Sequence, residues 1–139
     1  MADINPSGWG GYANDITVMG SRLYFEAINS SGFELWAHET SNGSTWQVAD
    51  ITPGGGNGYA QYITVMGSRL YFQATDGSNG YELWVHDPAS GSTWMVTNFC
   101  TFTAHGCLWG TYITNMVAVG NSLYFDADDP LLSLGVELH

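Results

Sequence analysis

Short runs of alternating hydrophobic and polar residues, separated by turn residues, make up most of this chain. Four such runs in the first third cover residues 16–19, 23–27, 33–38 and 45–51, and the second third repeats them at 63–66, 70–74, 81–86 and 93–98. Alternation with a period of two residues predicts β-strands, and no stretch shows the 3.6-residue period of a helix. The chain is therefore predicted to be all-β.

The runs recur because the sequence itself repeats. Residues 16–25, ITVMGSRLYF, return unchanged at 63–72, and a weaker copy, MVAVGNSLYF, occupies 116–125. Gly20-Ser21 is predicted to form a tight hairpin turn, since Gly supplies a positive φ. The first two copies are 47 residues apart. A period of this length predicts one repeat domain of about three units, at roughly 2–48, 49–96 and 97–139.

The third unit departs from the other two. An insertion around residues 100–107 widens the spacing from the 47 residues between Leu23 and Leu70 to 53 residues between Leu70 and Leu123. The unit stops at 136–139, where we expect its third strand still to be running and its fourth strand to be missing. Residues 2–4, Ala-Asp-Ile, match 49–51 at the end of a fourth strand, so the two termini resemble two sides of one cut in a repeating array.

The third strand of each unit has apolar or aromatic side chains on both of its faces. Phe33, Leu35 and Ala37 alternate with Glu34, Trp36 and His38. A four-stranded sheet with this pattern needs a sheet packed on each side, as in a β-propeller blade. Three blades cannot close a ring, so we expect self-association, with a homodimer of three plus three blades favoured over a larger ring or a longer array. In that dimer, residues 2–4 of one chain would lie beside the unfinished blade of the other.

The charge balance excludes several classes of partner. The chain has no Lys, two Arg and 13 carboxylates, which gives a formal net charge of -11. Nucleic acids and anionic membrane surfaces are therefore not expected partners. No apolar run approaches the roughly 18 residues of a membrane helix, and the first ten residues, MADINPSGWG, lack the basic and apolar regions of an export signal.

Two motifs resemble the ELWxxDGT repeats of large bacterial extracellular proteins. These are Phe33-Glu34-Leu35-Trp36 and Tyr81-Glu82-Leu83-Trp84, each after a Leu-Tyr-Phe strand; residues 3–6 and 50–55 match the segment between repeats. The family's Asp-Gly-Thr is replaced here by residues 39–41 and 87–89, and the third copy keeps only Glu137-Leu138. The resemblance implies propeller-like blades, an extracellular setting and no defined enzymatic activity.

The inserted loop holds both cysteines, Cys100 and Cys107, with His105 between them. A disulfide across the loop, worth about 2 to 3 kcal/mol, is the favoured interpretation. Free thiols and a zinc site remain alternatives, although the spacing fits no standard zinc pattern and a fourth ligand is not evident. We expect no metal and no cofactor.

Other polar residues recur with the repeat and have structural explanations. We interpret His38 and His86 as hydrogen-bonded strand residues, and Arg22 and Arg69 as partners of the repeated glutamates Glu34, Glu82 and Glu137. Residues 76–80, DGSNG, favour a turn over a calcium loop. No catalytic triad, nucleophile with its base, or carboxylate pair stands out, so no enzymatic activity is predicted.

Aromatic residues provide the best sequence argument for ligand binding. Sugar rings stack on such side chains, and repeated shallow sites suit multivalent glycan capture. The leading hypothesis is an extracellular binding or scaffold module that binds carbohydrate; the alternative is a purely structural self-assembling propeller fragment or an engineered repeat protein. The strand tryptophans Trp36, Trp46, Trp84 and Trp94 are predicted to pack between blades. The candidate ligand-binding residues near the loops between units are Trp9, Tyr12, Tyr59, Trp109 and Tyr112.

Overall fold

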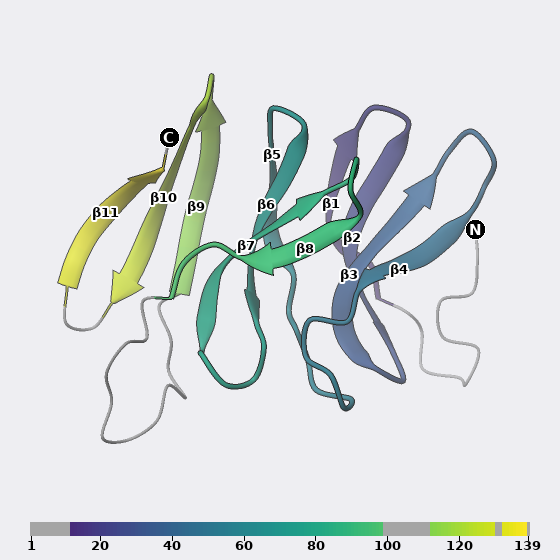
Figure 1. Ribbon diagram of the computed structural model, residues 1–139, viewed down its shortest axis with the longest axis horizontal. Helices are drawn as coiled ribbons and strands as arrows, with labels where there is room; N and C mark the ends of the chain where they lie inside the picture. The colour runs from purple at the N-terminus through teal and green to yellow at the C-terminus, as the bar shows by residue number, and fades with distance from the viewer. Residues whose placement is uncertain (1–11, 99–111, 130–131, 139) are drawn as a thin grey trace.

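The computed structural model describes residues 12–98, 112–129 and 132–138, with side chains described for 12–98 and 112–127. These residues form eleven strands and no helix, in three antiparallel sheets (Figure 1). The all-β prediction is therefore confirmed for the described residues, and each of the eight predicted strands coincides with an observed strand.

Within each sheet, neighbours in sequence are neighbours in space. Sheet 1 contains β1 (Asn14–Met19), β2 (Arg22–Asn29), β3 (Gly32–Glu39) and β4 (Thr45–Ala49). Sheet 2 contains β5 (Gln61–Met66), β6 (Arg69–Thr75), β7 (Tyr81–Asp87) and β8 (Ser92–Met95). Sheet 3 contains β9 (Tyr112–Val119), β10 (Ser122–Asp129) and β11 (Leu132–Leu138).

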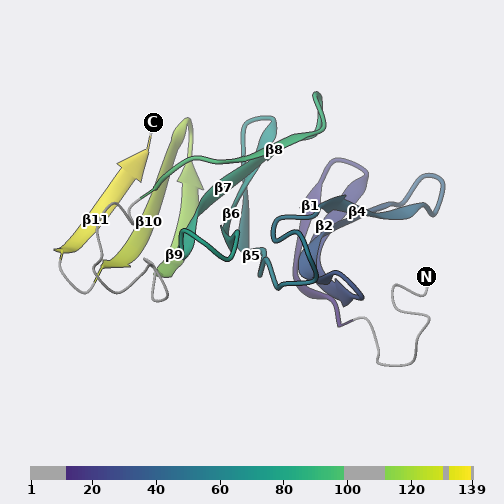
Figure 2. The ribbon, with the colours of Figure 1, turned by 60° about the horizontal axis from the view of Figure 1, so that its bottom comes forward.

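The three sheets stand in a row with sheet 2 in the middle, as Figures 1 and 2 show. Contacts between sheets run mainly through their first strands, since β1 lies against β5 and β5 lies against β9. Tyr24 and Leu35 of sheet 1 pack with Leu70 and Phe72 of sheet 2 in one hydrophobic cluster. A second cluster joins sheets 2 and 3 and contains Leu83, Ile113, Leu123 and Phe125.

Burial on both faces of the third strand agrees with the sequence pattern. Leu35 and Ala37 are fully buried toward sheet 2, whereas Trp36, on the opposite face, is 8% exposed and packs on Phe25. Trp46 and Trp84 pack against the cluster between sheets 1 and 2, as predicted, but Trp94 is 38% exposed. The sheets are therefore stacked layers with one hydrophobic cluster at each junction, whereas Trp36 belongs to a third cluster, within sheet 1.

The tight turn predicted at Gly20-Ser21 is confirmed. Met19 pairs with Arg22 across the turn, and Gly20 has a φ of 61°. Gly67 and Gly120 occupy the same position in the other sheets with φ values of 61° and 60°. Glycine adopts this left-handed conformation without the Cβ penalty of other residues, so the three hairpins share one geometry.

The fourth strands end earlier than predicted. β4 ends at Ala49 because the next amides leave the sheet: Ile51 N donates to Glu34 Oε2 at 2.8 Å. In sheet 2, β8 ends at Met95, and Val96 N donates to Leu83 O at 2.7 Å. The chain therefore leaves the sheet two residues sooner in sheet 1 and three residues sooner in sheet 2 than the alternation indicated.

The prediction for the last strand was wrong in length and in register. β11 has seven residues, as β7 does, so the third strand of sheet 3 is of full length. Glu137 pairs with Tyr124, which is the place of Ala37 in sheet 1, and Leu134 stands opposite Ala127, at the place of Glu34. The reason is the hairpin, which sets Asp129 opposite Leu132 just as it sets Asn29 opposite Gly32, so the register follows the turn and not the Glu-Leu motif.

Candidate functional site

The first strand of every sheet contains the same β-bulge. Two residues of β1, Asp15 and Ile16, oppose a single residue of β2, and β5 and β9 repeat this arrangement. The first bulge residue is left-handed in each case, with φ values of 52° at Asp15, 56° at Tyr62 and 51° at Asn115. Asp and Asn tolerate this conformation, but a tyrosine there carries backbone strain.

The three bulges line one open pocket of about 260 Å³ that crosses from sheet 1 to sheet 3. Asp15 Oδ2 accepts a hydrogen bond from the backbone N–H of Tyr62 at 3.0 Å. Asn115 Nδ2 donates to Asp126 Oδ2 at 2.9 Å. These bonds use one carboxylate oxygen of Asp15 and the amide nitrogen of Asn115. The pocket is also lined by Ile16, Thr17, Ile63, Thr64 and Met116.

A buried carboxylate lies opposite the start of the first bulge. Glu26 pairs with Asn14 across the strands, is 3% exposed, and its Oε2 has no hydrogen-bond partner among the described residues. Burial raises the pKa of Glu26 to about 7, and the nearby charge of Asp15 acts in the same direction. The equivalent residue of sheet 2 is Gln73, whose Oε1 accepts a hydrogen bond from Ile113 N at 2.6 Å. A neutral amide thus links one sheet to the next where sheet 1 has a carboxyl group.

Glu34 anchors the connection between sheets 1 and 2. The side chain is fully buried, and besides Ile51 N its carboxylate accepts a hydrogen bond from Thr52 N at 3.4 Å. Burial raises the pKa of Glu34 to about 7, against the opposing effect of these backbone donors. Gly58 allows the close approach, since a Cβ there would lie 2.6 Å from Glu34 Oε2. Glu34 is therefore a structural group of the loop and does not pair with an arginine as the sequence suggested.

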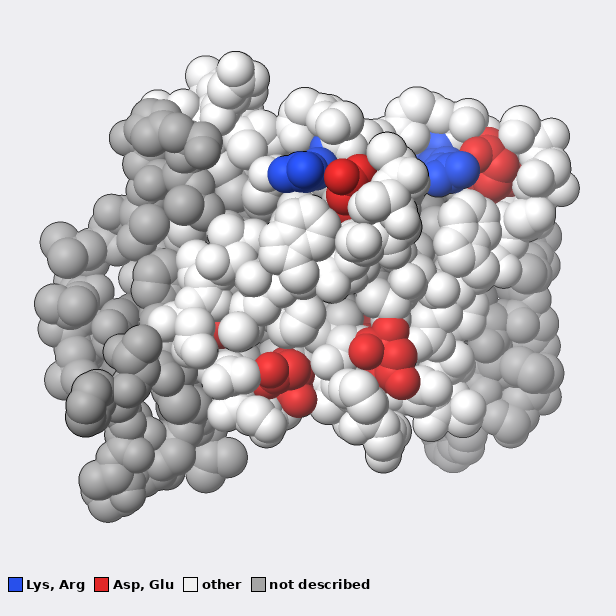
Figure 3. Space-filling model, in the orientation of Figure 1, with Lys and Arg blue, Asp and Glu red and all other residues white. Residues whose placement is uncertain are grey.

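The arginines pair instead with carboxylates at the ends of the third strands. Arg22 Nε lies 3.0 Å from Glu39 Oε2, and Arg69 Nε lies 3.5 Å from Asp87 Oδ2. Figure 3 shows each arginine next to an acidic group on the same edge of the molecule. The two guanidinium groups also cover Trp46 and Trp94, at 5.5 Å and 5.4 Å from the ring centroids. One face of each tryptophan is consequently occupied by the protein itself.

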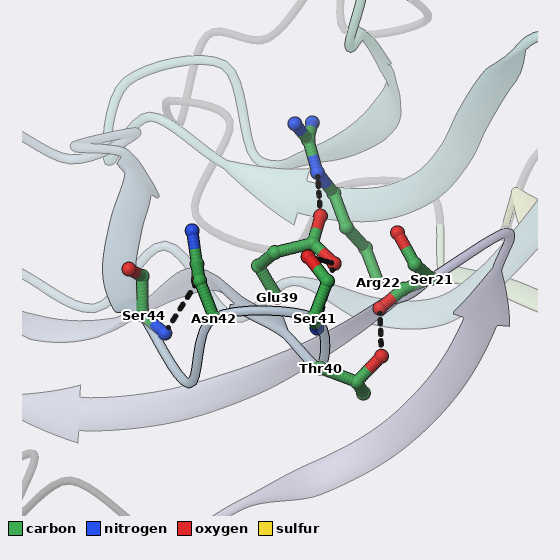
Figure 4. Close-up of polar contacts among 7 residues, drawn as sticks. All are labelled: Ser21, Arg22, Glu39, Thr40, Ser41, Asn42 and Ser44. Atoms are coloured by element: carbon green, nitrogen blue, oxygen red, sulfur yellow. Dashed lines mark hydrogen bonds and ion pairs between the residues drawn. The ribbon is translucent and has the colours of Figure 1, made fainter.

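Figure 4 shows how the turn after β3 holds its acidic group in place. Glu39 Oε1 accepts hydrogen bonds from Ser41 Oγ at 2.9 Å and Ser41 N at 3.1 Å. Thr40 Oγ1 donates to Ser21 O at 2.7 Å, which ties this turn to the hairpin between β1 and β2. Hydrogen bonds from Ser21, Ser41 and Arg22 lower the pKa of Glu39 to about 2. The arrangement fixes Arg22 and explains the repeated Arg residues as structural.

Four aromatic rings form a row along the starts of the third and first strands, here called the aromatic row: Phe33, Tyr59, Tyr81 and Tyr112. Phe33 and Tyr59 stack at 5.6 Å between centroids, Tyr59 and Tyr81 lie 6.2 Å apart, and Tyr81 and Tyr112 stack at 4.9 Å. The row crosses all three sheets. Tyr112, at one end, is 42% exposed, and Tyr12, the corresponding residue before sheet 1, is 67% exposed.

The structure thus brings two predicted binding residues, Tyr59 and Tyr112, into one row, and it leaves the ring of Tyr12 exposed. The predicted residues Trp9 and Trp109, and the disulfide candidates Cys100 and Cys107, lie outside the described residues. Sequence reasoning missed the pocket residues Asp15, Tyr62 and Asn115. The sequence did contain a signal for these three residues, because each lies three residues after the repeated tyrosine of its own unit, Tyr12, Tyr59 or Tyr112.

The remaining polar candidates have local partners. The prediction for the histidines is confirmed, since Nδ1 of His38 lies 2.7 Å from Thr45 Oγ1 and Nδ1 of His86 lies 2.8 Å from Thr93 Oγ1. Asp76 Oδ1 accepts hydrogen bonds from two backbone amides of its own turn, at 2.8 and 2.9 Å. Across the described parts of the chain, no three His, Cys, Asp or Glu side chains gather as a metal site.

Comparison with known proteins gives one informative result. No known family model matches the chain, and no curated protein matches it. A solved structure of the tricorn protease is similar, with a TM-score of 0.56 and 19% sequence identity over 84% of this chain. The chain spans only 11% of that protein, so the likeness concerns the fold alone. Within the described residues, no helix is long and apolar enough to cross a membrane.

Proposed function

We propose that this chain is a non-enzymatic binding module built of β-propeller blades and that it works outside the cell. Two four-stranded sheets and one three-stranded sheet among the described residues, all antiparallel and stacked through their first strands, support the propeller. The tricorn protease, which has propeller domains, supports the same interpretation at the level of fold. The extracellular setting rests on the resemblance of the Glu-Leu-Trp motifs to repeats of bacterial extracellular proteins.

The proposed ligand is a carbohydrate, and the observation that carries this proposal is the pocket at the three bulges. It combines a carboxylate from Asp15, an amide from Asn115 and the 42% exposed ring of Tyr62. A sugar presents vicinal hydroxyl groups that donate to and accept from carboxylates and amides, and C–H faces that pack on an aromatic ring. The left-handed backbone at Tyr62 also supports a site here, because strained residues of this kind cluster at functional sites.

The aromatic row lies near the starts of the first strands, close to the pocket at the bulges, and enlarges the surface on which a glycan could bind. Tyr112 lies three residues before Asn115, a distance of roughly 10 Å along a strand. Tyr59 is contacted by Phe33 and by Tyr81, whereas Tyr112 stacks on Tyr81 alone among the described rings. The exposed rings of Tyr12 and Tyr112 are therefore the stacking platforms that we assign to further sugar units of a longer glycan.

A glycan array tests this function, and Asn115→Gly is the variant of choice. Glycine retains the left-handed bulge and removes the amide, so we expect the fold to persist while the signal of a bound glycan falls about tenfold. Asn42→Gly is the matched control, because Asn42 is an exposed turn asparagine at the far end of β3 and β4. A flat array with the unmodified chain, or equal binding by both variants, would contradict a carbohydrate site in this pocket.

A structural, self-assembling role is the second candidate, and a different observation favours it. The face of sheet 3 that points away from sheet 2 is apolar and exposed, with Val117, Val119 and Tyr124 at 51%, 62% and 41%. Propeller sheets bury such faces on a neighbour, and three blades do not close a ring. Homodimerisation would complete the ring, and both roles are compatible in one assembly.

A further inference from the structure

The row of sheets ends in two faces that are apolar and exposed. At one end, Ile16 and Val18 of β1 are 60% and 65% exposed; we call these two residues the leading face. At the other end lie Val117 and Val119 of β9 and Tyr124 of β10, which we call the trailing face. Tyr124 is the cross-strand partner of Val117, so the trailing face is one contiguous patch.

Residues at the positions of the trailing face are covered in the other two sheets. Tyr24 in sheet 1 corresponds to Tyr124, and it is only 1% exposed because it packs in the cluster with sheet 2. Met19, which corresponds to Val119, packs against the same cluster. In sheet 2, Met66 and Tyr71 pack against the cluster with sheet 3. Each repeat therefore presents this patch to the sheet that follows it, and sheet 3 has no following sheet among the described residues.

The first strand of sheet 2, which helps to cover sheet 1, has an exposed copy elsewhere in the chain. Sheet 2 covers sheet 1 with Ile63 and Val65 of β5, together with Leu70 and Phe72. These residues belong to 63–72, whose sequence is identical to 16–25, so Ile16 and Val18 are the same residues at the same bulged strand. The leading face of one chain thus has the composition and backbone that fit the trailing face.

We propose that a second copy of this chain docks head to tail, with the leading face of one copy on the trailing face of the other. The proposal rests on the propeller architecture proposed above, and it assigns the partner and the two surfaces. β9 of one copy then meets β1 of the next just as β1 meets β5 and β5 meets β9 within the chain. The contacts between first strands that join the sheets within one chain would thus also join the two copies.

A polar contact supports the same pairing. Within the chain, the side chain of Asp15 accepts a hydrogen bond from the N–H of Tyr62, the equivalent bulge residue of the next sheet. Asn115 occupies this position in sheet 3, and its amide oxygen is an acceptor of the same kind. In the docked pair it would accept from the N–H of Asp15 of the other copy. A different protein could replace the second copy only if it carried both the apolar residues of the leading face and a backbone N–H at the position of Asp15.

Sedimentation velocity of two single variants and of their mixture tests the proposal. Ile16→Glu places a charge in the leading face and Val119→Glu places one in the trailing face, and both positions are exposed, so folding should persist and is checked by circular dichroism. Each variant alone is expected to associate roughly a hundredfold more weakly than the unmodified chain. An equimolar mixture retains one intact leading face and one intact trailing face, and should form a one-to-one pair.

Val96→Glu is the control, since Val96 is 39% exposed on neither face, and it should associate like the unmodified chain. A monomeric unmodified chain at all attainable concentrations overturns the proposal. So does a mixture that stays monomeric, or an Ile16→Glu variant that still dimerises, which would indicate that like faces meet. The measurement is made without glycan, so its outcome is independent of the array that tests carbohydrate binding.

Discussion

Glu26 is the residue whose environment most clearly determines how the molecule responds to pH. Its carboxyl group is buried, one oxygen lacks a partner among the described residues, and its pKa is raised from 4.5 to about 7. Glu34 has a pKa raised to the same value. Between pH 4.5 and 7 the folded state therefore holds protons that the unfolded state releases. The free energy of unfolding consequently falls as pH rises through this window.

The first prediction is that the melting temperature decreases by several degrees between pH 5 and pH 8, measured by circular dichroism. Glu26→Gln should remove part of this decrease and raise the melting temperature at pH 8, because Gln73 already serves at the equivalent position. Asn42→Ser, at an exposed residue of the turn after β3, is the control and should leave the pH dependence unchanged. A Glu26→Gln protein as pH-sensitive as the unmodified chain would show that Glu26 does not titrate in this range.

At the scale of elements, the sequence predicted the strands well and the irregularities poorly. Alternation and Gly20-Ser21 were sufficient for the hairpins because they are local signals. The bulge at Asp15 and Ile16 was not predicted. A bulge puts two residues of one strand opposite a single residue of its partner, and alternation within one short strand does not show where the extra residue lies. The register of β11 was predicted from Glu137-Leu138, and the hairpin imposed another.

The candidate site was predicted only in part, because the sequence does not show which residues the bulges bring together. Tyr59 and Tyr112 were identified because aromatic residues in loops between repeats are conspicuous in the sequence. Asp15 and Asn115 were not, because ordinary polar residues gain significance only when the bulges set them around one pocket. Contacts between sheets, such as Tyr81 on Tyr112, join residues far apart in sequence and follow from the stacking.

A substitution at Tyr62 tests whether the bulge stores strain. Tyr62 adopts a φ of 56°, which Asn tolerates better than Tyr, and it is 42% exposed, so little packing is lost. Tyr62→Asn should raise the free energy of unfolding in urea by about 0.5 to 1 kcal/mol. Tyr62→Phe keeps the strain and serves as the control. If the two variants are equally stable, the left-handed backbone carries no measurable cost.

At the scale of the whole molecule, a head-to-tail contact either closes into a ring or propagates into a filament. If the three described sheets are propeller blades, as proposed, two copies bring six of them together, which lies within the four to eight blades of a closed propeller. Each chain carries a formal net charge of -11, so the copies repel one another at low ionic strength. Association should therefore tighten between about 20 mM and 500 mM salt, and weaker association in salt would indicate that attractive ion pairs hold the copies together.

The most direct test of the account is the molar mass of the unmodified chain, measured by light scattering over a hundredfold range of concentration in 0.15 M salt. A closed ring of two copies predicts a plateau at twice 15.1 kDa that does not rise further with concentration. A mass of 15.1 kDa throughout, or one that grows without limit, would contradict the closed pair of three-sheet chains.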